Sequence, residues 1–134
     1  MGILGIGVDL VYVPRILVLL TRRNPEKFAS KILSIEEHKQ WSEIQDTNTK
    51  ARVRFLAVRW SVKEAAYKAM YPTVKPLWRQ LTYRSLTPHG DKPSLEYHPA
   101  LPEDGKNVGK MHVSVSHDGD YVYSSVVVEE RKTE

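Results

Sequence analysis

The chain has 134 residues, 41% of them hydrophobic and 27% charged, which fits one globular domain (1–134) and excludes a disordered tail. The lack of cysteine excludes a disulfide framework, a thiolate metal site and a cysteine nucleophile. No apolar run approaches the ~18 residues of a membrane-spanning helix, and a net charge of +4 favours an anionic partner: nucleic acid, a phosphate-rich cofactor or an acidic protein.

The first half of the chain predicts one strand followed by three helices. The apolar segment 3–8 indicates a buried strand that ends at Asp9, which leaves no room for a secretory signal ahead of it. Ser34, followed by two glutamates, is typical of a helix start, and Pro72 ends the longest helix. The predicted helices span residues 14–24, 34–44 and 51–71.

The second half of the chain predicts four strands. Six of the eight prolines lie between Pro72 and Pro102, which indicates strands and turns there. An alternating segment, a turn around Gly119 and a second apolar segment predict a final hairpin, and the charged tail 129–134 is expected to fray. The predicted strands span residues 81–86, 94–98, 112–117 and 121–128. The element order β-α-α-α-β-β-β-β predicts an α+β fold.

Asp9 is the first candidate for chemistry. A carboxylate that ends a buried strand is held by the backbone on one side and open on the other. That position suits Mg²⁺, which takes one or two protein carboxylates and completes its coordination with water and phosphate. A turn-forming or helix-capping role for Asp9 is the structural alternative.

Glu64 and Lys68 form the second candidate. They lie four residues apart on the longest predicted helix, in the orientation that favours a simple surface ion pair. Alternatively, Glu64 binds a metal and Lys68 binds the phosphate that the metal holds. Trp60 and Tyr67 share this helix face, which favours partial burial of the pair and hence the second interpretation.

Histidine and clustered basic residues are the remaining candidates. His117 ends the first strand of the last hairpin, where it can act as a base, donate to a phosphate, or lie in a loop without a role. The basic residues form two clusters, which indicate either anion binding or a solvated surface. The first cluster contains Arg15, Arg22, Arg23, Lys27 and Lys31, and the second contains Lys50, Arg52, Arg54, Arg59 and Lys63.

Four segments taken together resemble the holo-acyl-carrier-protein synthase family, the small phosphopantetheinyl transferases. A Gly-x-Gly-x-Asp motif is weak alone, but here it is followed by the other family segments in the family's order and spacing, over nearly the whole chain. The matching segments are residues 5–10, 28–33, 59–69 and 112–117.

The resemblance implies both a fold and a reaction. The fold is a small antiparallel sheet packed against a long central helix and shorter helices. In the reaction, the 4′-phosphopantetheine group of coenzyme A moves to a serine of an apo acyl carrier protein, and 3′,5′-ADP leaves. The reaction needs Mg²⁺, and it activates carrier proteins for fatty acid biosynthesis.

The resemblance also assigns residue roles. Asp9 and Glu64 match the Mg²⁺ ligands, and Lys68 matches a residue that contacts the coenzyme A phosphates. His117 matches a histidine of the coenzyme cleft and completes the implied catalytic set. The remaining coenzyme-binding residues that it implies are Lys50, Arg52, Arg59 and Lys63.

The carrier protein and two further copies of the chain are the implied protein partners. Family members dock the acidic carrier protein on the first helix, onto which Arg15, Arg22 and Arg23 map. They form homotrimers with active sites at the subunit boundaries. The family's usual glycine-rich turn is replaced by the segment 71–78, which is more similar to eukaryotic members. The expected location is therefore the cytoplasm, or the mitochondrion for a eukaryotic protein, with no cleavable targeting segment.

Two other functions remain open. A non-catalytic, basic nucleic-acid-binding module would explain the charge, although aromatic residues are not interleaved with either basic cluster. A Mg²⁺-dependent hydrolase of the coenzyme A pyrophosphate would use Asp9 and Glu64 without a carrier protein. The resemblance favours the transferase, with no nucleic acid and no membrane among its partners.

Overall fold

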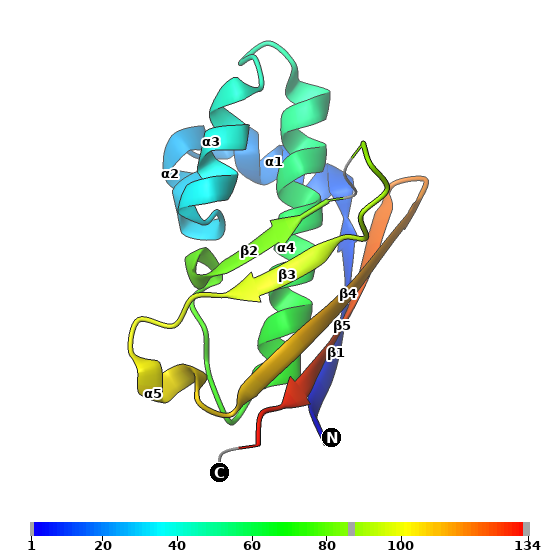
Figure 1. Cartoon of the computed structure of the whole chain (residues 1–134). Coiled ribbons are helices and arrows are strands. Elements are labelled where there is room, and N and C mark those ends of the chain that lie inside the picture. Colours follow the sequence, from blue (N-terminus) through cyan, green and yellow to red (C-terminus); the bar gives the residue numbers. More distant parts are fainter. Residues whose placement is uncertain (1, 86–87, 133–134) are drawn as a thin grey trace.

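A long helix packed against a three-stranded sheet organises the computed structural model, which describes residues 2–85 and 88–132 (Figure 1). The α+β prediction is confirmed. The elements are β1 (Ile3–Tyr12), α1 (Val13–Arg22), α2 (Pro25–Ile32), α3 (Ile35–Glu43), α4 (Thr49–Met70), the 3₁₀ helix η1 (Trp78–Gln80), β2 (Leu81–Arg84), β3 (Ser94–Tyr97), α5 (Pro102–Gly105), β4 (Val108–Asp118) and β5 (Tyr121–Glu130).

The larger sheet has the order β1-β5-β4 and is antiparallel throughout. The smaller sheet pairs β2 with β3. Helices α1, α2 and α3 gather around the N-terminal half of α4, near the β4–β5 turn, whereas both chain termini lie at the opposite end of the larger sheet (Figure 1). This arrangement places the end of β1, the start of α1 and the middle of α4 close together.

Two glycines let β1 approach α4 closely. A Cβ atom on Gly5 would lie 1.9 Å from the Ala69 carbonyl oxygen, and one on Gly7 would lie 2.0 Å from the Ala65 carbonyl oxygen. No other residue type fits at either position without moving the backbone, since ordinary contacts begin near 3.4 Å. The two glycines therefore set the distance between strand and helix just before Asp9.

Helix α2 was not predicted. The Asn24-Pro25 pair ends α1, but it also starts α2, because the Asn24 side chain accepts hydrogen bonds from the backbone N–H groups of Glu26 and Lys27. Proline suits the first helical position, where its missing N–H is not needed. The predicted Ser34 cap of α3 is confirmed and forms a capping box with Glu37.

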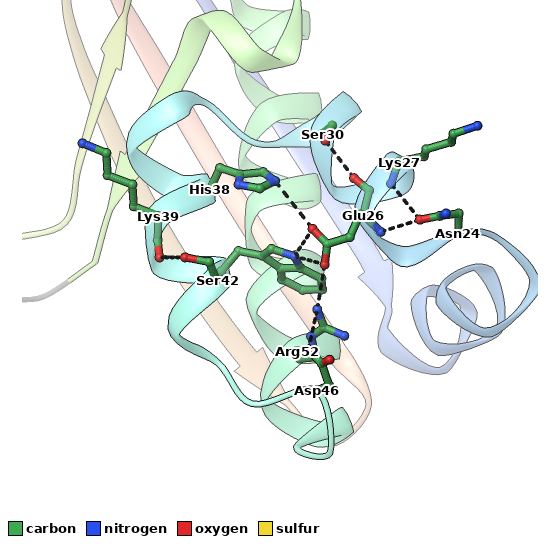
Figure 2. Close-up of polar contacts among 10 residues, drawn as sticks. Asn24, Glu26, Lys27, Ser30, His38, Lys39, Ser42, Asp46 and Arg52 are labelled. Carbon is green, nitrogen blue, oxygen red and sulfur yellow. Dashed lines mark hydrogen bonds and ion pairs between the residues drawn. The ribbon is translucent and has the colours of Figure 1, made fainter.

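Contacts of Glu26 join α2, α3 and α4 (Figure 2). Its carboxylate accepts hydrogen bonds from the Trp41 indole at 3.2 Å and from Arg52 at 3.1 Å. The Arg52 guanidinium also stacks on the Trp41 ring at 4.0 Å. Figure 2 shows the side chain of Arg52 pointing from α4 towards Glu26, with His38 on the other side of the carboxylate.

A buried ion pair holds α3, α4 and β2 together. The Lys63 ammonium donates to Glu37 at 2.5 Å and to the carbonyl oxygens of Ile32, Trp78 and Leu81. The other Glu37 oxygen accepts from the backbone of the β2 strand. Both side chains are fully buried, and burial lowers the pKa of Lys63 to about 8.

Several element boundaries differ from the prediction. Strand β1 continues past Asp9 to Tyr12 because it pairs with β5 along this whole length. Glu129 and Glu130 belong to β5 rather than to a frayed tail, since they pair with Ile3 and Val108. The end of the strand predicted over 81–86 lies outside the described residues. Within 2–85 and 88–132, no helix has the length and hydrophobicity of a membrane span.

Candidate active site

Asp9 lies on the side of β1 that faces α4. The Ser61 hydroxyl lies 3.3 Å from the Asp9 carbonyl oxygen, and one carboxylate oxygen, Oδ1, lies 3.6 Å from the Lys68 ammonium. The same ammonium donates to the Val8 carbonyl at 3.0 Å. Backbone and side-chain contacts therefore fix both Asp9 and Lys68 at this edge of the sheet.

The other carboxylate oxygen of Asp9 lacks a partner. Among the described residues, Oδ2 is buried and accepts no hydrogen bond. Burial raises the pKa of Asp9 above its usual value, and Lys68, Arg15 and Ser61 oppose this effect in that order. An oxygen that is buried without a partner costs free energy, so its position here points to a ligand that supplies a positive charge.

Glu64 lies between Ser61 and Lys68 on α4, on the side of the helix that borders Asp9. Its side chain is partly exposed, and the described residues offer it no ion pair or hydrogen bond. Trp60, one turn earlier, is partly buried between the Arg15 guanidinium at 5.9 Å and the Trp78 ring at 5.0 Å. The partial burial expected for the Glu64–Lys68 pair is found for Glu64 only, because the Lys68 side chain is 53% exposed.

These two carboxylates fit a Mg²⁺ ion. Across the described part of the chain, no group of three or more histidine, aspartate and glutamate side chains is arranged to hold a metal ion. Mg²⁺ needs no such cluster, because it keeps several waters and is bound by one or two carboxylates together with substrate phosphates. The partnerless oxygen of Asp9 and the carboxylate of Glu64, which pairs with none of the described residues, are two candidate ligands of this kind, and the Lys68 ammonium beside Asp9 could face a phosphate.

His117 and Lys50 line a separate pocket. The pocket has a volume of about 410 Å³ and lies between the start of α1, the start of α4 and the β4–β5 turn. It is mostly apolar, and its ionisable residues are Lys50, Arg54, His117, Asp120 and Tyr121. The structure therefore brings together two of the predicted coenzyme-binding residues.

This pocket and the Asp9 site lie on opposite sides of α1. Leu17 lines the pocket, whereas Arg15 contacts Trp60 and lowers the pKa of Asp9. Side chains two positions apart in a helix, such as these, point in directions that differ by roughly 200°. Lys50 and Glu64 are also fourteen residues apart on α4, which corresponds to roughly 21 Å along the helix axis. One chain does not bring the two groups of predicted residues together.

Arg52, Arg59 and Lys63 lie on the far side of α4 from Asp9 and point into the protein. Lys63 pairs with Glu37 and Arg52 pairs with Glu26, so both ion pairs have structural roles. Arg59 stacks on the Phe55 ring at 3.8 Å, and no carboxylate within the described residues pairs with it. Its Nε is buried without a partner. Arg59 alone of the three lacks an ion pair among the described residues, but it is buried between Phe55 and Tyr83 and interacts electrostatically with Glu37.

The predicted docking residues lie on or just after α1. Arg15, Arg22 and Arg23 are all exposed, and Arg23 lies over the Phe28 ring at 6.0 Å. Sequence reasoning missed that Leu17 and Val18 are exposed on the same helix. The run of five apolar residues from Ile16 to Leu20 was the available signal, because a helix cannot turn five consecutive side chains to one buried face.

The face of the larger sheet that points away from α4 is apolar and exposed. Ile6 and Leu10 of β1 are 66% and 60% exposed, and Tyr123 of β5, which pairs with Leu10, is 44% exposed. Tyr12 and Tyr121 pair across the same two strands with their rings 5.3 Å apart. An exposed apolar surface of this extent is typical of a protein interface.

The chain is similar to known enzymes over almost its full length. The profile described as the 4′-phosphopantetheinyl transferase superfamily matches residues 5–124. The holo-[acyl-carrier-protein] synthase of Delftia acidovorans is 37% identical over 133 residues, which cover 96% of this chain and 98% of that protein.

Solved structures agree. The holo-[acyl-carrier-protein] synthase of Neisseria meningitidis is 30% identical with a TM-score of 0.77, covering 95% of this chain and 98% of that one. The holo-(acyl-carrier-protein) synthase of Bacillus anthracis, solved in complex with CoA (3′,5′-ADP), is 25% identical with a TM-score of 0.71, covering 98% of this chain and 100% of that one. The fold, the matched profile and these identities together show that the chain belongs to the 4′-phosphopantetheinyl transferase superfamily, whose enzymes include the holo-[acyl-carrier-protein] synthases.

Proposed function

We propose that this protein transfers the 4′-phosphopantetheine group of coenzyme A to a serine of an apo acyl carrier protein in a Mg²⁺-dependent reaction. A new P–O bond forms to the serine oxygen, whose hydroxyl proton passes to a base or to solvent, while the P–O bond to the ADP moiety breaks and 3′,5′-ADP leaves. The observation that carries the proposal is the buried, partnerless carboxylate oxygen of Asp9, with Lys68 beside it and Glu64 on the same helix face.

Asp9 and Glu64 would hold the metal, and Lys68 would bind the phosphates. Bound Mg²⁺ neutralises charge on a pyrophosphate and stabilises the charge that develops on the leaving phosphate. Lys68 has a half-exposed side chain whose ammonium is anchored to the Val8 carbonyl, so its charge is fixed at the site while remaining open to a ligand. Such fixed charges orient the reacting groups and contribute most of the catalysis in phosphoryl transfer.

Lys50 and His117 would bind the 3′-phosphate of coenzyme A from a neighbouring subunit. Only a ribose separates this phosphate from the pyrophosphate, whereas Lys50 and Glu64 of one chain lie roughly 21 Å apart along α4. The exposed apolar face around Ile6 and Leu10 provides a surface for that subunit. A homotrimer with active sites at its boundaries satisfies both observations.

Mixed oligomers test the boundary site. In a co-expressed mixture of Asp9→Asn and His117→Ala chains, each inactive alone, random assembly of a trimer pairs the two intact halves at about a quarter of boundaries. We expect activity to recover to about that fraction of wild type. No recovery from mixtures shown to contain both chains would place the whole site in one subunit.

The carrier protein would dock on α1. Arg15, Arg22 and Arg23 present positive charge next to the exposed Leu17 and Val18, which suits a partner with an acidic surface around an apolar strip. Acyl carrier proteins of fatty acid biosynthesis have this character. We place the reaction in the cytoplasm, in line with the bacterial relatives.

The direct test is the intact mass of an apo acyl carrier protein after incubation with this protein, coenzyme A and Mg²⁺. We expect a gain of one phosphopantetheine group, and no gain when EDTA is added. Consumption of coenzyme A without a change in carrier mass would indicate a pyrophosphate hydrolase. If neither substrate changes with several carrier proteins, the basic surface would instead indicate a binding module.

A further inference from the structure

Strand β1 and helix α4 meet in regular steps. Gly5 lies against Ala69 and Gly7 lies against Ala65, and the next step brings Asp9 against Ser61. Two strand residues advance ~6.8 Å and four helix residues ~6.0 Å, so the steps stay matched over this length. Ser61 is therefore the residue that α4 presents to Asp9.

The Ser61 hydroxyl also contacts β5. It lies 2.7 Å from the Ser124 hydroxyl, and both side chains are fully buried. Ser124 in turn lies directly opposite Asp9 in the pairing of β5 with β1. A hydroxyl has one proton to donate, so if Ser61 donates to the Asp9 carbonyl, Ser124 donates to Ser61. The result is a chain of hydrogen bonds from β5 through α4 to the backbone of Asp9.

Neither packing nor helix formation requires the hydroxyl groups of Ser61 and Ser124. Alanine is the better helix former and occupies the two preceding steps, at Ala69 and Ala65. A buried hydroxyl is unfavourable unless it is hydrogen-bonded. The glycine–alanine pattern changes to a hydrogen-bonded serine at the step that carries the metal-binding carboxylate, where the orientation of the backbone matters most.

We propose that Ser61 and Ser124 are positioning residues that hold Asp9 in line with Glu64 for metal binding. The inference rests on the proposed Mg²⁺ site. Glu64 follows Ser61 by less than one turn of α4, so fixing the Asp9 carbonyl to Ser61 also fixes the separation of the two carboxylates. Partners that orient metal ligands typically change metal affinity by roughly 10- to 100-fold when removed.

The test measures the dissociation constant of Mn²⁺, a substitute for Mg²⁺, in the presence of coenzyme A and without carrier protein. Free Mn²⁺ is followed by electron paramagnetic resonance. Ser61→Ala is expected to raise the constant about tenfold. Ser124→Ala is expected to have a smaller effect, because the Ser61 hydroxyl still reaches the Asp9 carbonyl. Asp9→Asn is the reference variant that loses the site.

A double variant separates positioning from stability. Ser61→Ala leaves the Ser124 hydroxyl buried without its partner, whereas the double variant removes both hydroxyls. We therefore expect the double variant to melt at a higher temperature than Ser61→Ala, yet to bind Mn²⁺ as weakly. Ala66→Gly, on the opposite side of α4, is a control that weakens the helix without touching Asp9, and its Mn²⁺ affinity should equal that of wild type.

Two results would overturn this inference without overturning the proposed metal site. The first is wild-type Mn²⁺ affinity in folded Ser61→Ala while Asp9→Asn loses binding. The second is an affinity that follows melting temperature across all variants, including recovery in the double variant, since this is the behaviour of a purely structural contact. Failure of the wild-type protein to bind Mn²⁺ would overturn the metal site and the inference together.

Discussion

Gly7→Ala tests how closely the site depends on the approach of β1 to α4. The added Cβ would lie 2.0 Å from the Ala65 carbonyl oxygen, whereas an ordinary contact needs at least 3.4 Å. Strand and helix must therefore separate by about 1.4 Å, the difference of those two distances, at the residue pair next to Asp9. Overpacking of this kind costs typically about 1–3 kcal/mol of folding free energy.

The same displacement should reduce the catalytic rate strongly while lowering the melting temperature by only a few degrees. A misplacement of ~1 Å can lower a rate by about 100-fold, and here it changes the separation of Asp9 from Glu64 and Lys68. We expect kcat/KM for carrier protein to fall at least about 100-fold, with a melting temperature lower by roughly 3–10 °C. Coupled measurement of carrier mass and thermal unfolding checks both values.

Gly109→Ala is the matched control for a backbone clash away from the site. Its Cβ would lie 2.8 Å from the Glu129 carbonyl oxygen, at the opposite end of the larger sheet from Asp9. This variant should lose stability but retain its activity below the melting temperature. Equal activity losses in Gly7→Ala and Gly109→Ala, or full activity in Gly7→Ala, would refute the argument that the glycine step positions the carboxylates.

Three further variants test the charges of the site and its supports. Burial raises the pKa of Asp9 above its ordinary 3.8, so the folded state favours the protonated form, and this contribution to stability is lost as pH rises through the folded pKa. Asp9→Asn should therefore raise the melting temperature at pH 7 without metal, a gain that disappears below pH 3.8, while abolishing transfer; a melting temperature at or below wild type at pH 7 would contradict this reasoning. Lys63→Met leaves the fully buried Glu37 carboxylate unpaired and should cost about 3–5 kcal/mol in denaturant unfolding. If Lys63 instead binds coenzyme A, the Lys63→Met variant would show a raised KM for coenzyme A under conditions in which it is still folded. Arg22→Glu should raise the KM for carrier protein about tenfold, mostly at low salt, with kcat unchanged. An unchanged KM would move the docking surface away from the end of α1.

Local patterns in the sequence were sufficient to predict most of the fold. Apolar runs, alternation and caps predicted β1, α1, α3, α4 and the last hairpin, since these signals lie within each segment. Helix α2 was missed because Asn24-Pro25 is both a stop signal and a cap with proline at the first position. The ends of the last hairpin were underestimated because Glu129 pairs with Ile3, at the other end of the chain.

The candidate site was only partly predictable, because its contacts join distant segments. Asp9 and Lys68 were both identified as candidates, but nothing local to either residue shows that they lie within 3.6 Å of each other. The buried role of Lys63 depends on Glu37, in another helix. Ser61 drew no attention as a functional residue because its partner, Ser124, is in the last strand.

The measurement that tests the central claim most directly compares phosphopantetheine transfer by the wild-type protein with transfer by the Asp9→Asn variant. Wild type and Asp9→Asn are incubated side by side with coenzyme A, Mg²⁺ and apo acyl carrier protein, and the carrier is weighed over time by intact mass spectrometry. We predict that wild type adds one phosphopantetheine group to each carrier and that folded Asp9→Asn adds none over the same period. Equal modification by both proteins would contradict the claim that the Asp9 carboxylate, through its partnerless oxygen, holds the metal for this reaction.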